Sequence, residues 1–114
     1  MRDLPLYEVK ADLFRGLAHP VRVRILELVT QSAEVPVSTL LTETGLQPPH
    51  LSQHLAVLRR YGLIVSQRRG SQVFCRAADA SVEGLLAAAR AFLSHTLRAN
   101  GHAAASLADA LTRT

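Results

Sequence analysis

The sequence is poor in aromatic residues and in cysteine. Only five of its 114 residues are aromatic, and none of the five is tryptophan. Alanine and leucine must therefore supply most of the core, and both favour helices over sheet. The single cysteine, Cys75, excludes an internal disulfide and fits a reducing cytoplasm. No apolar run approaches the roughly 20 residues of a membrane-spanning helix, and the N-terminus has no hydrophobic stretch of the signal-peptide type.

Lysine is also scarce, although the chain is basic. The net charge is +4, and all but one of the 13 basic side chains are arginine. Arginine has a planar, forked head that matches phosphate oxygens and guanine edges. A GC-rich genome produces the same composition, so net charge alone does not identify a nucleic-acid partner. The positions of the arginines along the chain carry more information.

Hydrophobic periodicity predicts helices at both ends of a single domain, residues 1–114. Apolar residues recur at helical spacing over residues 6–18. A second helix is expected directly after His19, because the proline that follows suits a first turn. A long helix with a wide apolar face is expected from Asp79 to about residue 98, and residues 103–112 form either one more short helix or a frayed tail.

The middle of the chain predicts a helix-turn-helix at about residues 38–61. Ser38 is the expected cap of a short helix that Gly45 ends in the left-handed conformation. Pro48 opens the next helix, where a missing N–H costs nothing, and that helix runs to about Tyr61. Two helices joined by a short turn that contains glycine are typical of this motif.

Two short strands are expected next, at residues 63–68 and 72–77, around a tip at residues 69–71. This hairpin is basic and forms a wing at about residues 63–77. The predicted fold is therefore mainly α with a small β-hairpin, a winged helix-turn-helix in the order α-α-α-α-β-β-α.

The predicted second helix of the motif carries two histidines four residues apart, His50 and His54. Metalloproteases bind zinc with that spacing, but they place the general-base glutamate where this chain has Leu51. Without the carboxylate, zinc hydrolysis lacks its chemistry. We expect Leu51 and its apolar neighbours to be buried and both histidines to face outward, beside Gln53, which can pair with adenine. The alternative is that these are ordinary exposed polar side chains.

The outward face and the arginines that follow it predict contacts with DNA bases and phosphates, with the hairpin tip near the minor groove. The alternative for the arginines is a solvated surface. The predicted contacts are Gln47, His50, Ser52, Gln53, His54, Arg59, Arg60, Arg68, Arg69, Ser71 and Gln72.

At these motifs the sequence resembles the ArsR/SmtB family of bacterial winged-helix repressors. The resemblance covers roughly residues 10–98 and rests on "LFRGLAHPVRVRILELV", on "LSQHLAVLRRYGLIVSQRRGSQVFCR" and on the acidic start of the last long helix. It implies a homodimer, formed by the helices at about 6–18 and 79–98, that binds an imperfect palindrome in promoter DNA. The wide apolar face of the last helix agrees with this, since one small subunit could hardly bury it alone.

The resemblance also raises the question of a metal sensor. In the position of the family's Cys-x-Cys pair this chain has Pro36 and Ser38, so that site is absent. Of the second family pattern, along the last helix, two of four ligands remain, Asp79 and His95. These two could still bind nickel or zinc across a dimer interface, with His102 as a further ligand. The alternative is that Asp79 only caps its helix.

Other functions remain open at this point. Cys75 is expected to be an inert packed residue rather than a redox switch, because it has no resolving partner. The sequence has no recognisable catalytic motif, so an enzyme is not expected. A winged helix can also bind proteins, and the incomplete metal site suits a regulator whose sensing comes from a partner protein or a non-metal effector.

Overall fold

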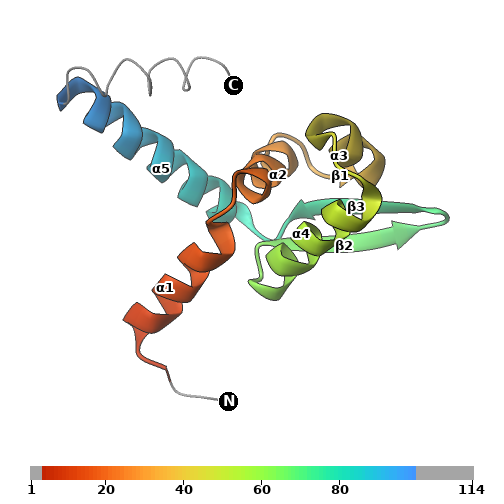
Figure 1. Ribbon diagram of the computed structural model, residues 1–114, viewed down its shortest axis with the longest axis horizontal. Helices are drawn as coiled ribbons and strands as arrows, with labels where there is room; N and C mark the ends of the chain where they lie inside the picture. The colour runs from red at the N-terminus through yellow and green to blue at the C-terminus, as the bar shows by residue number, and fades with distance from the viewer. Residues whose placement is uncertain (1–3, 100–114) are drawn as a thin grey trace. The chain divides into compact units, whose positions relative to one another are not determined.

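The computed structural model describes residues 4–99 and divides the chain into two units, Met1–Val82 and Glu83–Thr114. In chain order the described elements are α1 (Leu6–Leu17), α2 (Pro20–Thr30), β1 (Val35–Pro36), α3 (Val37–Thr44), α4 (Pro48–Arg60), β2 (Ile64–Arg69), β3 (Gln72–Ala77) and α5 (Ala80–Ala99). Figure 1 shows this order, with the β2–β3 hairpin projecting past α3 and α4. The predicted winged helix-turn-helix is confirmed, and β1 is an addition that the sequence did not suggest.

The cap residues of α2 and α3 show why these helices begin where they do. One of the two differs from the sequence prediction. His19 caps α2, and its Nδ1 accepts a hydrogen bond from the Val21 amide at 3.1 Å. The prediction that Ser38 caps α3 is wrong, because α3 already begins at Val37 and its cap position is Pro36. Proline favours an extended backbone at this position. Pro36 can therefore be both the last residue of β1 and the cap of α3. Gly45 ends α3 at φ 69°, as expected.

The three strands form an antiparallel sheet in the order β1-β3-β2. Cys75 on β3 pairs with Val35 on one side and with Ser66 on the other. The hairpin is tighter than predicted: Arg69, expected at the tip, is the last residue of β2, and Gly70 turns the chain at φ 64°. The sheet therefore ties the start of α3 to the base of the wing.

The core of the first unit lies between α2, α3, α4 and the sheet. Gly16, at the end of α1, approaches the Tyr61 ring so closely that an added Cβ would lie 2.5 Å from a ring carbon. Only a glycine fits this crossing of α1 with the end of α4. The fully or almost fully buried side chains are Ile25, Leu26, Val29, Leu40, Leu51, Leu58, Ile64 and Cys75.

The second unit is described through the helix α5, whose last three side chains lie outside the described set. Phe92 is 67% exposed and Leu93 is 37% exposed, so part of the predicted apolar face is open in this chain. The segment predicted at 103–112, and His102, also lie outside the described residues. Within residues 4–99, no helix combines the length and apolar character needed to cross a membrane.

Candidate nucleic-acid interface

The helix α4 has one buried and one exposed side, as expected of the recognition helix of a helix-turn-helix. Its buried side consists of Leu51, Leu55 and Leu58. At about 100° per residue, Gln53 and Arg60 lie on the opposite side, and both are exposed. The three leucines fix the rotation of α4, so Gln53 and Arg60 must face away from the core.

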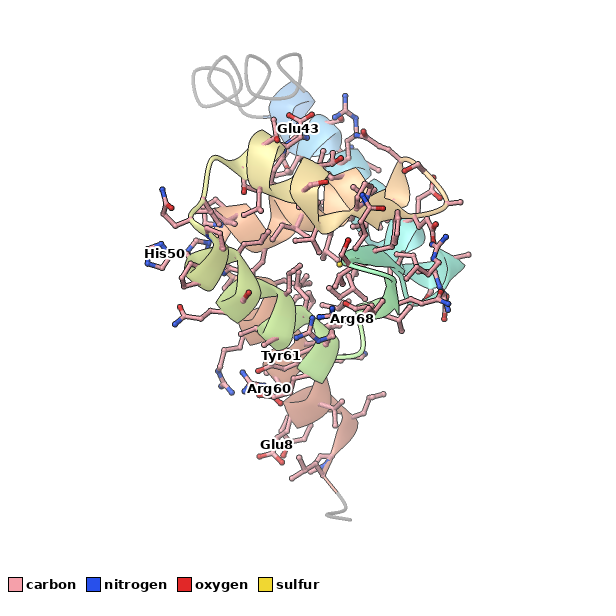
Figure 2. The ribbon with its side chains drawn as sticks, turned by 90° about the vertical axis from the view of Figure 1, so that its right-hand side faces the viewer. Glu8, Glu43, His50, Arg60, Tyr61 and Arg68 are labelled. Atoms are coloured by element: carbon pink, nitrogen blue, oxygen red, sulfur yellow. The ribbon has the colours of Figure 1, made fainter. Side chains whose placement is uncertain are left out.

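The exposed side of α4 runs from His50 to Arg60. Figure 2 shows His50 at the start of the helix, directed away from the core, and Arg60 at the other end. Gln47 holds the cap position but makes no side-chain capping hydrogen bond. Two prolines form the first turn, so fewer amides there need a partner.

His54 departs from the sequence prediction, because it does not face straight outward. It is only partly exposed, and its ring lies 4.5 Å from the His19 ring, centroid to centroid, with the planes tilted by 55°. Burial lowers the pKa of His54 below its ordinary value, and the neighbouring His19, Arg22 and His50 lower it further. His54 is therefore predominantly neutral at pH 7.

Arg22, near His54, is held by the end of α1. Its Nε donates to the Gly16 carbonyl at 2.6 Å, and its second terminal nitrogen donates to the Arg15 carbonyl at 3.4 Å. These carbonyls belong to the last turn of α1, where a cation is favoured by the helix dipole. Sequence reasoning did not predict the roles of His19 and Arg22; only the His-Pro pair at the start of α2 hinted at a cap.

A groove of about 410 Å³ between α4 and the wing is also lined by the start of α3. Arg59 lines it and also donates to the Ser66 hydroxyl at 3.3 Å, so α4 is tied to β2. Five of the ten lining residues are apolar. The polar lining residues are Ser38, Ser52, Arg59, Ser71 and Gln72, and all except Ser38 are among the predicted DNA contacts.

Arg68 and Arg69, two of the three arginines of the wing, lie on opposite faces of the hairpin. Strand alternation puts Arg68 on the face of Ser66 and Cys75, which packs toward the helices. Arg69 lies on the other face, where it forms an ion pair with Glu34 and places its guanidinium 4.1 Å from the centre of the Phe74 ring. Figure 2 shows Arg68 beside the second half of α4.

The predicted metal ligands are not brought together in this chain. Asp79 caps α5 and accepts a hydrogen bond from the Ser81 amide. That backbone bond, together with the Ser81 hydroxyl, lowers the pKa of Asp79. His95 lies sixteen residues further along, a rise of about 24 Å in an α-helix, so one ion could not bind both within a subunit. Among residues 4–99, no three His, Cys, Asp or Glu side chains gather in a way that could hold a metal ion.

Cys75 is more deeply buried than the sequence suggested. Its exposed fraction is 0%, and its Sγ lies 3.6 Å from the Ser66 hydroxyl oxygen. It fills the centre of the sheet, where Val35 and Ser66 are its neighbours. The cysteine is thus part of the packing that connects the wing to the core.

Comparison with known proteins gives relatives that cover most of this chain. A model described as a helix-turn-helix domain matches residues 17–67. The uncharacterized HTH-type transcriptional regulator Rv0081 of Mycobacterium tuberculosis is 40% identical over 97 residues, 85% of each chain. Its crystal structure is similar to this fold with a TM-score of 0.78, covering 84% of this chain and 96% of that one at 41% identity.

Two further relatives come from other sources. The homodimeric winged helix-turn-helix DNA-binding domain of Mb0332 from Mycobacterium bovis is described as a possible ArsR-family transcriptional regulator. Its solution structure has a TM-score of 0.74, covers 85% of this chain and 89% of that one, and is 29% identical. The arsenic resistance transcriptional regulator ArsR1 of Pseudomonas putida is 32% identical over 89 residues, 72% of this chain and 70% of the relative.

Proposed function

The chain belongs to the ArsR family of winged helix-turn-helix transcriptional regulators, and from this membership we propose that it binds a palindromic operator in double-stranded promoter DNA as a homodimer. The exposed side of α4 is the observation that carries the proposal. It carries His50, Gln53 and Arg60, with the small apolar residues Ala56 and Val57 between them, and the leucines on the other side of the helix hold it outward. A helix of this kind fits the major groove.

The proposed contacts are of two kinds, those with DNA bases and those with DNA phosphates. Gln53 lies at the centre of the exposed side, where its amide can pair with adenine. Arg60 and Arg68 supply positive charge at the end of α4 and on the wing, where they can bind phosphates. The full set is Gln47, His50, Ser52, Gln53, His54, Arg59, Arg60, Arg68, Arg69, Ser71 and Gln72. Arg69 is its weakest member, because Glu34 already neutralises its charge.

The groove between α4 and the wing supports a path for one DNA strand. Hydroxyl groups from three elements line it, and Arg59 is its cation. The apolar lining suits a deoxyribose, and the polar rim suits the phosphates on either side of it. We infer that Ser38, which is not among the predicted DNA contacts, also contacts the DNA backbone.

The homodimer is supported by the apolar side chains that this chain leaves exposed. On α1 only Gly16 is buried, whereas Phe14 is 59% exposed. A monomer rarely exposes so many large apolar groups, and the relative Mb0332 is a homodimer. Two-fold symmetry would place two copies of α4 about one DNA turn apart. The exposed side chains are Leu4, Leu6, Tyr7, Val9 and Phe14 of the first unit and Phe92 and Leu93 of the second.

We infer that this regulator acts in the cytoplasm, has no catalytic role, and has a degenerate or absent metal-sensing site. Asp79 already serves as a helix cap, which supports this interpretation. The signal would then come from a partner protein or another effector. The alternative, nickel or zinc bound by Asp79 and His95 from two subunits, predicts that added metal changes operator affinity about tenfold and that a chelator reverses the change.

The experiment that tests the proposal compares wild type with the variant Gln53→Ala/His54→Ala. Operator affinity is measured at fixed salt with competitor DNA, and the oligomeric state is measured by sedimentation. We expect the variant to lose sequence-specific binding and to remain a dimer. Unchanged specificity would show that α4 is not the recognition helix.

A further inference from the structure

The region where the end of α1, the start of α2 and the middle of α4 meet contains an unusual set of groups. His19 belongs to the start of α2, Arg22 to its first turns, and His54 to α4. We call these three residues the histidine corner. Its two rings touch, and its arginine is fixed to the carbonyls of α1. The titratable and charged groups that face His54 are His19, Arg22 and, from its own helix, His50.

The hydrogen bond of His19 constrains its chemistry. Nδ1 accepts from the Val21 amide, so its lone pair is already in use. A neutral imidazole has only one such lone pair, and its other nitrogen then carries the proton. The ring therefore has no free lone pair for a metal ion, which argues against a metal site at the two touching histidines. The His19 ring also contacts the His54 ring, and that contact limits how the His54 side chain can turn.

The electrostatics of the corner favour a neutral His54 in the free protein. Burial and the three neighbouring groups lower its pKa, the largest single cause being burial. A DNA phosphate near the outer edge of α4 would act in the opposite direction, because a nearby negative charge stabilises the imidazolium. The same side chain thus has different proton affinities in the free and bound proteins.

We propose that His19 is a positioning residue for DNA recognition: it holds the His54 ring at the edge of the recognition helix, so that operator binding is linked to proton uptake at His54. The proposal rests on the DNA-binding function proposed above. It assigns His19 a role besides its cap, although His19 itself need not touch DNA. Operator affinity rises as the pH falls from about 8 to about 6, by at most about tenfold per pH unit for each proton taken up.

The test uses His19→Asn, because asparagine caps helices as well as any residue but has no ring and does not titrate in this range. The ring protons of His54 are followed by NMR as the pH is changed, in the free protein, with His50→Asn as the matched control. The His19 ring packs against the His54 ring, so its removal lessens the burial that lowers the pKa of His54, whereas His50 acts on that pKa through its charge. The titration midpoint of His54 should therefore rise more in His19→Asn than in His50→Asn. Equal midpoints in both variants would overturn the positioning role.

The second measurement is operator affinity at about pH 6 and about pH 8 for wild type, His19→Asn and His54→Asn. Wild type should bind more tightly at the lower pH, and both variants should show a smaller change. The same pH dependence in all three proteins would overturn the proton linkage. Because the NMR titration needs no DNA, it still tests the His19–His54 contact if no operator binding is found, and the two proposals can fail separately.

Discussion

The helices α1 and α4 are both amphipathic, yet only α4 has its apolar side covered. α4 buries three leucines and exposes its polar side, whereas α1 buries only Gly16 and exposes Leu6 and Phe14. A helix whose apolar side is already covered can offer its polar side to DNA. A helix whose apolar side is open needs another apolar surface. The contrast divides the first unit into a region for DNA recognition and a region for association.

The largest predicted effect comes from the buried side of α4. Leu58→Ala removes a side chain with 0% exposure and should lower the free energy of unfolding by about 2–5 kcal/mol, because a cavity replaces packed atoms. Urea denaturation measures the change. The same substitution on the exposed side of α1, Leu6→Ala, should have an effect that depends on protein concentration. A concentration-independent loss of equal size in both variants would contradict the contrast between the helices.

The next effect concerns association. Phe14→Ser places a hydroxyl in the exposed apolar side of α1 and should weaken the homodimer by about tenfold or more, or about 1.4 kcal/mol, because an aromatic side chain no longer leaves water. Sedimentation equilibrium measures the dissociation constant. Ala11→Ser, also on an exposed position of α1, adds the same hydroxyl without removing a ring and should change it less. A dimer unaffected by Phe14→Ser would place the interface elsewhere.

Within the DNA-binding region, substitutions of Arg68 and Arg69 should have different effects. Arg68→Gln should weaken operator binding and reduce the slope of log affinity against log salt by about 0.9 for each phosphate that the variant no longer neutralises. Arg69→Gln should have a smaller effect on both, since Arg69 is paired with Glu34 on the other face of the hairpin. DNA-binding titrations at several salt concentrations give the operator affinity and its salt slope for each variant. A larger loss at Arg69 would mean that its ion pair opens when DNA binds.

The smallest predicted effect is on the pH dependence of stability. The lowered pKa of His54 means that the unfolded chain binds a proton more readily than the folded one below about pH 6.5. The free energy of unfolding should therefore fall as the pH drops from that value toward the lower pKa of the folded state. Thermal denaturation of wild type and His54→Gln at about pH 8 and about pH 5.5 measures the difference. A steeper fall in the variant would contradict the sign.

The order of helices and strands was predictable because each carries its own local signal. Pro20 and Pro48 mark helix starts, Gly45 marks a helix end, and the leucine spacing of α4 gives its buried side. The strand β1 was not predictable, since two residues carry no periodicity and Val35 is a strand residue only because Cys75 lies opposite. The cap at Ser38 was misassigned for the same reason: strand pairing moved the start of α3 to Val37.

The candidate interface was predictable in composition but less so in detail. Helical spacing placed Gln53 and His50 on the exposed side of α4, and the structure agrees. It could not reveal that His54 touches His19, because the two residues are 35 positions apart and meet only through packing. Nor could it separate Arg68 from Arg69, since the partner of Arg69 lies in the loop before β1. Long-range contacts decide which of several similar side chains is available.

The measurement that tests the central claim most directly is fluorescence anisotropy of the purified protein on its own promoter fragment and on a scrambled fragment of equal length. Salt is held constant and excess competitor DNA is present in both. We predict that binding to the promoter fragment survives the competitor with two subunits per site, and that binding to the scrambled fragment is lost. Equal affinity for the two fragments would contradict sequence recognition by α4 and leave only charge attraction to DNA.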